Sequence, residues 1–168
     1  MPIPRRLARE KALQALYQID LTGATPEKAL EALFPDAKIP DEVDDFVVSL
    51  VYGTQQHQEN LDQCIRPYLR GWTLERLSVI DRNILRMALF EMMHIGTPFS
   101  VVMDEAVELA KRFSTDEGRR FVNGVLSAVS RDMEKDSASP GVFFSSRRRH
   151  TRCLYWELIP VTTAPPSA

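Results

Sequence analysis

The sequence predicts an all-α protein of about seven helices that form two small helical bundles. Apolar residues recur at three- and four-residue spacing in most segments, which is the period of an amphipathic helix, and no segment shows the strict alternation of a strand. The stretch from Val79 to Ile95 is apolar around most of its circumference. Because such a helix must be buried on most sides, we expect it to be the central helix.

The first elements follow from local signals near the N-terminus. Pro4 suits the first turn of a helix, and small residues at positions 8, 12 and 15 then give a narrow stripe that allows a neighbouring helix to approach closely. After a breaker at residues 21–26, Thr25 is a suitable N-cap and Pro26 a suitable first residue. They predict a short helix that ends near Phe34.

The next elements lead to the central helix. Residues 41–57 carry a clear amphipathic repeat. Residues 59–69 are also predicted to be helical, although Pro67 must bend or break the last turns. A brief helical turn at residues 74–77 precedes the central helix, whose polar residues gather in its first turns. We therefore expect that end, near Asp81, to reach solvent.

Two helices complete the predicted fold. Ser100 is a candidate N-cap for a helix that extends to Phe113, and Thr115 is a candidate N-cap for the last helix. We expect one domain at residues 1–135, with subdomains of about 1–72 and 73–135. Residues 136–168 have no helical period and are predicted to be disordered; their SSRRRHTRC segment resembles a peptide encoded by sequencing-adapter DNA, which favours a non-native origin after about residue 139.

Composition and motifs exclude several function classes. The net charge of −2 gives no global basic footprint, so any binding of nucleic acid must come from a local patch. No run is apolar and long enough to span a bilayer, and the chain is expected to be cytoplasmic. His57, His94 and His150 have no partner at metal-ligand spacing. With no glycine-rich phosphate loop and no nucleophile elbow, we expect no enzyme, no metal and no cofactor.

The cations of the first helix are the best candidates for a binding site. Arg5, Arg6, Arg9 and Lys11 lie within seven residues. Composition alone favours an ordinary charged face, whereas paired guanidinium donors would also suit phosphate groups. Tyr17 lies two turns beyond Arg9 on the same stripe; such a ring is usually in the core, but beside a basic patch it is suited to stacking on an unpaired base.

Four segments together resemble the NusB family of bacterial transcription antitermination factors. They cover roughly residues 4–133, in order and at family-like spacing, and they read RRLAREKALQALYQ (5–18), IDRNILRMALFEM (80–92), DEAVELAKRF (104–113) and RRFVNGVL (119–126). The resemblance implies an all-α fold of seven helices in two subdomains. It also implies a non-catalytic protein that pairs with NusE, a small-subunit ribosomal protein, and binds single-stranded boxA-type RNA within the RNA polymerase antitermination complex, supporting ribosomal RNA transcription.

The resemblance also implies which residues would bind these partners. The RNA contacts would fall on the first and last helices, at Arg5, Arg6, Arg9, Tyr17, Glu117, Arg120 and Phe121, with Lys11 beside them. The NusE-facing surface would lie near Glu75, Arg76, Asp81 and Arg82. Two alternatives stay open: a helical protein-interaction adaptor whose basic end touches no RNA, and an RNA-binding domain detached from an RNA methyltransferase, although no glycine-rich methyl-donor site follows here.

Overall fold

The computed structural model describes residues 2–137, and within that range it contains seven α-helices and no strand. The predicted all-α fold is confirmed, whereas the prediction of a disordered tail falls almost entirely outside the described residues. The helices are α1 (Arg5–Thr22), α2 (Pro26–Leu33), α3 (Asp45–Gln56), α4 (Gln58–Ile65), α5 (Val79–Phe90), α6 (Phe99–Phe113) and α7 (Asp116–Ser137). Two short 3-10 helices, η1 (Arg66–Tyr68) and η2 (Leu74–Arg76), precede α5, and a π-helical turn, η3 (Glu91–Ile95), follows it.

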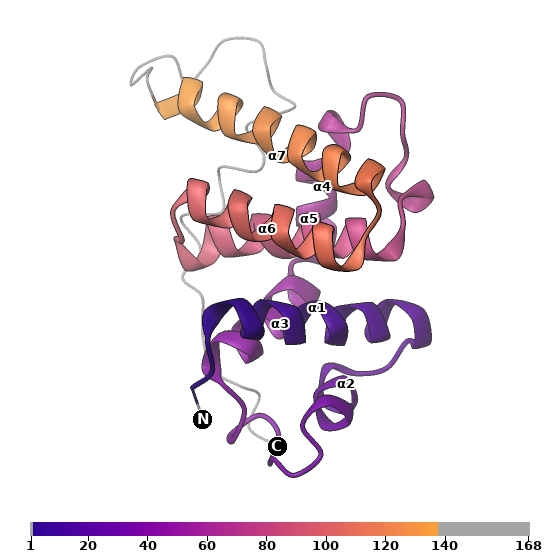
Figure 1. The fold of residues 1–168 in the computed structure, drawn as a ribbon, viewed down its shortest axis with the longest axis vertical. Coiled ribbons are helices and arrows are strands. Elements are labelled where there is room, and N and C mark those ends of the chain that lie inside the picture. The colour runs from indigo at the N-terminus through magenta and orange to yellow at the C-terminus, as the bar shows by residue number, and fades with distance from the viewer. Residues whose placement is uncertain (1, 138–168) are drawn as a thin grey trace.

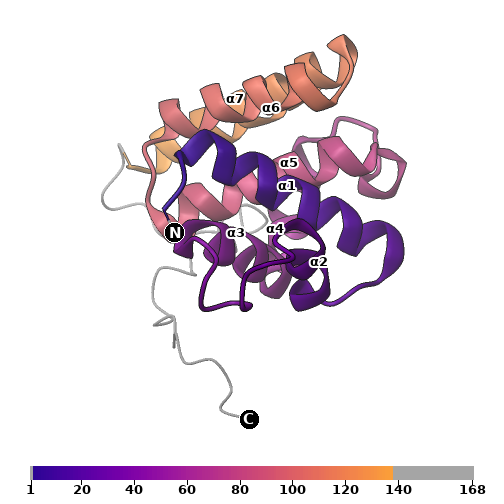
Figure 2. The ribbon, with the colours of Figure 1, turned by 60° about the horizontal axis from the view of Figure 1, so that its bottom comes forward.

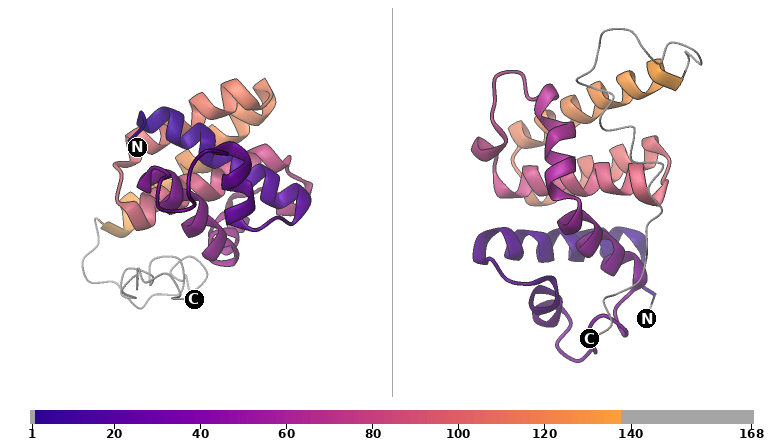
Figure 3. Two further views of the ribbon diagram at one scale, coloured as in Figure 1. Left: turned by 90° about the horizontal axis from the view of Figure 1, so that it is seen from below. Right: turned by 180° about the vertical axis from the view of Figure 1, so that it is seen from behind.

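The helices form successive layers. From top to bottom, Figure 1 shows α7, then α6 with α5, then α1 with α3, and α2 at the base. The view from behind gives the same order (Figure 3), and the rotated view places α6 and α7 together above α1 (Figure 2). None of the helices within the described residues is both long and apolar enough to cross a bilayer.

Helix α5 is the centre of the fold, as the sequence predicts. It packs against α1, α3, α4, α6 and α7, and its residues from Asn83 to Phe90 are all buried. One cluster of buried apolar side chains extends from α1 to α7. This cluster crosses residue 72, so the division of the chain into two subdomains there stays a prediction.

Most polar residues in the first turns of α5 are buried, so the expectation that this end of the helix reaches solvent is wrong. Asp81, Asn83 and Arg86 are all buried. Each is compatible with burial because it has a partner on another element: Arg86, for example, donates from Nε to Oδ1 of Asp62 on α4 at 2.6 Å. These side chains therefore connect α5 to its neighbours through specific hydrogen bonds.

Side-chain caps define several helix starts. Thr25 and Thr115 accept hydrogen bonds from backbone N–H groups three residues later, as predicted. Ser78 caps α5 in the same way, although the sequence analysis did not single it out. The prediction for Ser100 is wrong, because α6 begins at Phe99 and the carbonyl of Pro98 accepts the first N–H groups.

A glycine allows α3 to pack closely on α5. A Cβ atom built on Gly53 would lie 2.6 Å from Cε1 of the Phe90 ring and closer still to Cζ. The Phe90 ring is buried and lies near His57 and His94, with ring-centroid separations of 5.7 and 5.0 Å. A side chain at position 53 would therefore displace a packed ring.

We expect Gly53→Ala to lower the free energy of unfolding by about 1–3 kcal/mol, the usual cost of overpacking a core. The matched control is Gly124→Ala on α7, where an added Cβ would meet nothing within 4 Å. That control should be neutral or stabilise the protein by up to about 1 kcal/mol. Urea unfolding of both variants measures the difference, and equal stabilities would contradict the close α3–α5 packing.

Candidate nucleic-acid interface

The N-terminal segment is fixed to α3 before α1 begins. The carboxylate of Asp44, the N-cap of α3, accepts hydrogen bonds from the backbone N–H groups of Ile3 at 3.0 Å and Phe46 at 2.9 Å. Burial raises the pKa of Asp44, but these hydrogen bonds outweigh burial and the pKa lies below its usual value. The guanidinium of Arg5 lies over the Phe46 ring at 4.0 Å from the centroid. Arg5 is thus held at the surface by a cation–π contact.

Arg6 is a second exposed cation of α1 that is oriented by a neighbour. Its side chain is 62% exposed, and its Nε and Nη2 donate to the two oxygens of Glu105 on α6 at 3.2 and 3.0 Å. The hydrogen bonds to Glu105 and the charge of that carboxylate raise the pKa of Arg6. Because Glu105 uses one edge of the guanidinium, the donors of the other edge can bind an oxyanion.

Arg9 occupies a different environment from the one expected for a surface patch. Its side chain is only 7% exposed, and Nε donates to Oε2 of the buried Glu91 at 3.0 Å. Nη1 also lies 3.8 Å from Glu105. The structure therefore places Arg9 inside the protein, between α1, η3 and α6, and corrects the expectation that it lies beside Arg5 and Arg6 at the surface.

Beyond Arg9, helix α1 is joined to α6 by a further ion pair. Lys11 is half-buried. One residue earlier, Glu10 accepts a hydrogen bond from Nη1 of Arg112 at 2.7 Å. Since Arg6 pairs with Glu105 and Glu10 with Arg112, α1 and α6 run in the same direction. The C-terminal half of α1 therefore lies at the end of the molecule where α6 turns into α7 (Figures 1 and 3).

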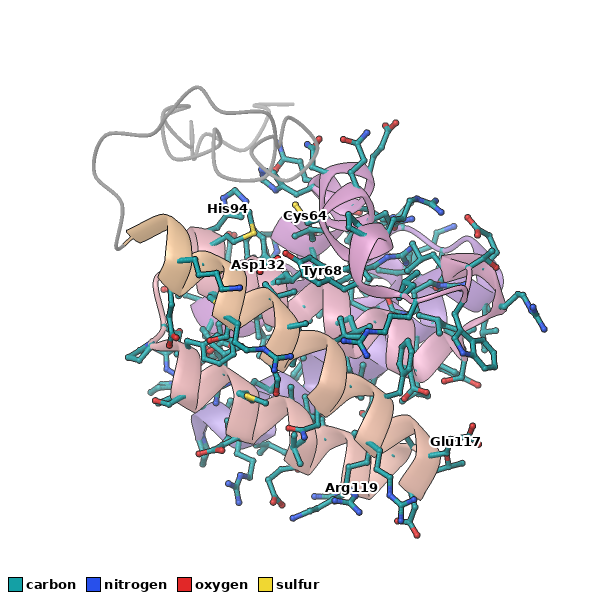
Figure 4. All side chains as sticks on the ribbon, turned by 90° about the horizontal axis from the view of Figure 1, so that it is seen from above. Cys64, Tyr68, His94, Glu117, Arg119 and Asp132 are labelled. Carbon is teal, nitrogen blue, oxygen red and sulfur yellow. The ribbon has the colours of Figure 1, made fainter. Side chains whose placement is uncertain are left out.

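Tyr17 and the first turn of α7 are exposed at this end. Tyr17 is 38% exposed, and Glu117 and Arg120 are exposed as well. Figure 4 shows Glu117 at the outer end of α7. The structure thus presents an exposed ring, an acid and an arginine at this end, whereas the exposed cation Arg6 pairs with Glu105 near the start of α1.

Gly118 brings the start of α7 close to α5. A Cβ atom at this position would lie 2.7 Å from Oδ2 of Asp81 and also overlap Ser114. Oδ1 of Asp81 accepts a hydrogen bond from the Ser114 hydroxyl at 2.6 Å. Asp81 is therefore a buried contact between α5 and the α6–α7 junction.

Phe121 lines a hollow between α7 and the η1–η2 connection. This hollow has a volume of about 690 Å³, and Tyr17 is not among its described lining residues. Its rings are Tyr68, Trp72 and Phe121, and its cations are Arg70, Arg131 and Lys135. Figure 4 shows Tyr68 pointing toward Asp132 on α7, and the Tyr68 hydroxyl donates to Oδ2 of Asp132 at 2.8 Å. Phe121 is half-buried and packs against the core. It lies on α7 and Tyr17 lies on α1, and the described lining of the hollow includes only Phe121 of the two.

The residues expected to face NusE fall into two groups. Glu75 and Arg76 on η2 are exposed; Glu75 pairs with Arg66 at 3.0 Å, and Arg76 lies over the Trp72 ring at 5.3 Å. Asp81 is buried, as described above. Arg82 is largely covered and donates from Nη2 to Asp20 on α1 at 2.7 Å.

The two histidines that the structure describes lie beside each other. His57 and His94 lie against each other with ring centroids 4.4 Å apart, and burial together with the charge of His57 lowers the pKa of His94. His150 lies outside the described residues. Within the described part of the chain, no three histidine, cysteine or acidic side chains are grouped so that they could hold a metal ion.

Sequence reasoning missed several residues that shape this surface. Glu105 and Arg112 lie in a segment that the sequence predicts only to be helical, and their contacts with α1 join residues about a hundred positions apart. No local pattern singles out Trp72. Its exposure of 49% is the signal that marks it in the structure, since a large exposed ring is informative only once its neighbours are known.

The two α1 arginines should differ in their effect on stability. We expect Arg9→Ala to lower the free energy of unfolding by about 3–5 kcal/mol, because it leaves the buried charge of Glu91 without its partner. Arg6→Ala should leave the free energy of unfolding nearly unchanged, because exposed ion pairs contribute little. Urea unfolding measures the free energy of unfolding of the two variants. An Arg9→Ala variant that is as stable as the parent would contradict the buried ion pair.

Comparison with known proteins agrees with this geometry. The family model described as the NusB family matches residues 6–131. A transcription antitermination protein NusB from Bacillus velezensis is 47% identical over 131 residues, covering 77% of this chain and 98% of the relative. A crystal structure of NusB from T. maritima superposes with a TM-score of 0.70 at 33% identity, covering 82% of this chain and 99% of that one. A structure of antitermination factors NusB and NusE in complex with double-stranded RNA gives a TM-score of 0.66 at 28% identity, covering 76% and 96%. This chain belongs to the NusB family.

Proposed function

We propose that this protein is a non-catalytic transcription antitermination factor that binds boxA-type single-stranded RNA together with the ribosomal protein NusE. In this role it would support ribosomal RNA transcription as part of the RNA polymerase antitermination complex, in the cytoplasm. The observation that carries the proposal is the family match over residues 6–131 combined with exposed cations on α1. A related structure contains NusB, NusE and double-stranded RNA, which supports NusE and RNA as partners, while the preference for a single strand rests on the aromatic residues.

The α1 surface suits the phosphates of such an RNA. Arg5 and Arg6 are exposed and each is oriented by a neighbour, Phe46 or Glu105. Arginines held in this way lose little side-chain freedom when they bind an oxyanion. Arg9 has a positioning role in the proposal, because its guanidinium is buried against Glu91.

The aromatic residues favour RNA whose bases are not paired. Tyr17 is exposed on α1, while Phe121 is half-buried on α7. A ring can stack on a base only when that base is splayed out of a helix, which is how most sequence-specific RNA sites are recognised. Glu117 and Arg120 would contact the RNA from the first turns of α7, where both are exposed.

The partner surface is proposed for the exposed part of η2. Glu75 and Arg76 are accessible there, whereas Asp81 and Arg82 would act indirectly by holding α5 to its neighbours. The Bacillus velezensis relative is matched over 98% of its own length. This favours an antitermination factor over an RNA-binding domain detached from a methyltransferase, and the oriented α1 arginines favour RNA binding over a protein adaptor.

Replacement of both exposed arginines tests the RNA surface. We expect Arg5→Ala with Arg6→Ala to weaken the binding of a boxA-type oligonucleotide and to flatten the dependence of log affinity on log salt by about 1.4, since each phosphate contact on a single strand contributes roughly 0.7. Fluorescence anisotropy over a salt series measures both quantities.

The matched control for this double variant is Lys28→Ala with Lys38→Ala, which removes two exposed cations from the α2 side of the protein. This control should leave affinity and salt dependence close to those of the parent. Unchanged binding by the arginine variant would remove α1 from the interface. The same RNA sequence in duplex form should compete less well, and equal competition would contradict the preference for a single strand.

A charge reversal tests the partner surface. We expect Arg76→Glu to weaken binding of NusE by at least about fivefold, because an arginine near the centre of an interface commonly contributes more than about 1 kcal/mol. Glu31→Lys on α2, also exposed, is the control. Isothermal titration calorimetry measures the affinity, and an unaffected Arg76 variant would place the NusE surface elsewhere.

A further inference from the structure

The hollow beside α7 combines features that suit an anionic, flat ligand. Its volume of about 690 Å³ falls within the range of small-molecule sites. Three rings and three cations line it, whereas the only acid among its described lining residues, Asp132, accepts a hydrogen bond from Tyr68. This concentration of positive charge occurs in a chain whose net charge is −2.

One wall of the hollow is a single face of α7. Phe121, Gly124, Ala128, Arg131 and Lys135 follow one another at three- and four-residue spacing and all line the hollow. The small residues lie in the middle of this face. A Cβ atom at Gly124 would meet nothing within 4 Å, so this face of α7 is open at position 124.

The opposite wall is a turn with an unusual backbone. Leu69 is buried and anchors the turn, and the N–H of Trp72 donates to the carbonyl of Leu69 at 3.1 Å. Between them, Arg70 has a φ of 45° and Gly71 a φ of 87°. A left-handed conformation is unfavourable for an arginine, and such strain is concentrated at binding sites. The turn places Arg70 and the exposed Trp72 in the lining of the hollow.

We propose that this hollow binds one nucleotide of the single-stranded RNA, with the base against Trp72 and the phosphate between Arg70 and Arg131. The inference rests on the proposed function and extends it, because Phe121 leads from the first turns of α7 into the hollow. Base stacking on an aromatic ring is tolerant of sequence, so the site would hold a neighbouring nucleotide in place without reading its identity. The Trp72 ring, with Arg76 over it at 5.3 Å, is still 49% exposed.

The fluorescence of Trp72 reports directly on occupancy. The sequence contains two tryptophans, Trp72 and Trp156, so Trp156→Phe in the full chain leaves Trp72 as the only indole. Titration with a boxA-type single-stranded oligonucleotide, in the absence of NusE, should quench this fluorescence in parallel with the anisotropy signal of the RNA. The steric variant Gly124→Leu should abolish the quench and lower RNA affinity by about fivefold or more, the lower end of the contribution of a stacked base.

Variants at two further positions separate the contact with the base from the contact with the phosphate. Trp72→Ala should lower RNA affinity while Trp72→Phe restores most of it, because the phenyl ring still offers a face for stacking. Arg131→Gln should lower the salt dependence of log affinity by about 0.7, equivalent to one phosphate contact on a single strand. Lys28→Gln is the control for loss of one charge. Thermal unfolding of Gly124→Leu verifies its fold; if it does not fold, the fluorescence titration and Arg131→Gln decide.

The outcomes distinguish this inference from the proposed function. RNA binding without any change in Trp72 fluorescence, together with parental affinity for Arg131→Gln, would overturn the nucleotide site and leave the proposed function intact. Loss of NusE binding by Gly124→Leu with retained RNA affinity would also overturn it, because the hollow would then be a protein-binding surface. Absence of RNA binding by the parent chain, with and without NusE, would instead refute the proposed function itself.

Discussion

The buried ion pair between Arg9 and Glu91 determines how α1 presents its other cations. Residues of an α-helix advance by about 100° each, so Arg5 and Arg6, one turn before Arg9, lie on opposite sides of it. With Arg9 directed inward to Glu91, Arg5 is directed to Phe46 on α3 and Arg6 to Glu105 on α6. The rotation of α1 about its own axis is therefore fixed by a side chain that does not itself reach the surface.

Such a pair contributes more to geometry than to net stability. Burying two charges costs much of the free energy that their attraction returns, and apolar residues of similar size often stabilise a protein as well. A guanidinium bound by two carboxylate oxygens, however, fits in one orientation only. Any register of α1 other than the observed one would leave Glu91 buried without its partner. The ion pair therefore selects one packing of α1, which the narrow stripe of small residues such as Ala8 and Ala12 would not select alone.

The sequence predicts those features that depend on neighbouring residues. The number of helices, the central position of α5 and the caps at Thr25 and Thr115 each follow from a pattern within a few residues. The start of α6 was misplaced because Pro98 and Ser100 compete for the same end, and the carbonyl of Pro98 provides the acceptors.

Residues whose environment depends on distant partners could not be placed from the sequence. Arg9 looks the same as Arg6 in the sequence, yet its burial depends on a carboxylate 82 residues away. Asp81 and Arg82 are adjacent polar residues at the start of a helix, and this local pattern predicts that their side chains reach solvent. Asp81 is buried because Ser114 and Gly118 leave room for its carboxylate. Of the candidate RNA-binding residues on α1, Arg5, Arg6 and Tyr17 are exposed, whereas Arg9 is buried.

The central segment formed by α5 and η3 holds α1 near one end and the start of α7 near the other. Asp81, near the start of α5, contacts the junction that begins α7, whereas Glu91, just after its end, holds α1. Asp20 at the far end of α1 also accepts from Asn83, so that α1 is attached to this segment at both ends. The arginines of α1 and the first turn of α7 need no contact with each other to keep a constant separation, because each is anchored to the same rigid helix. A single strand of RNA that follows α1 and then α7 would therefore meet a surface whose spacing exists before it binds, which reduces the ordering that binding requires.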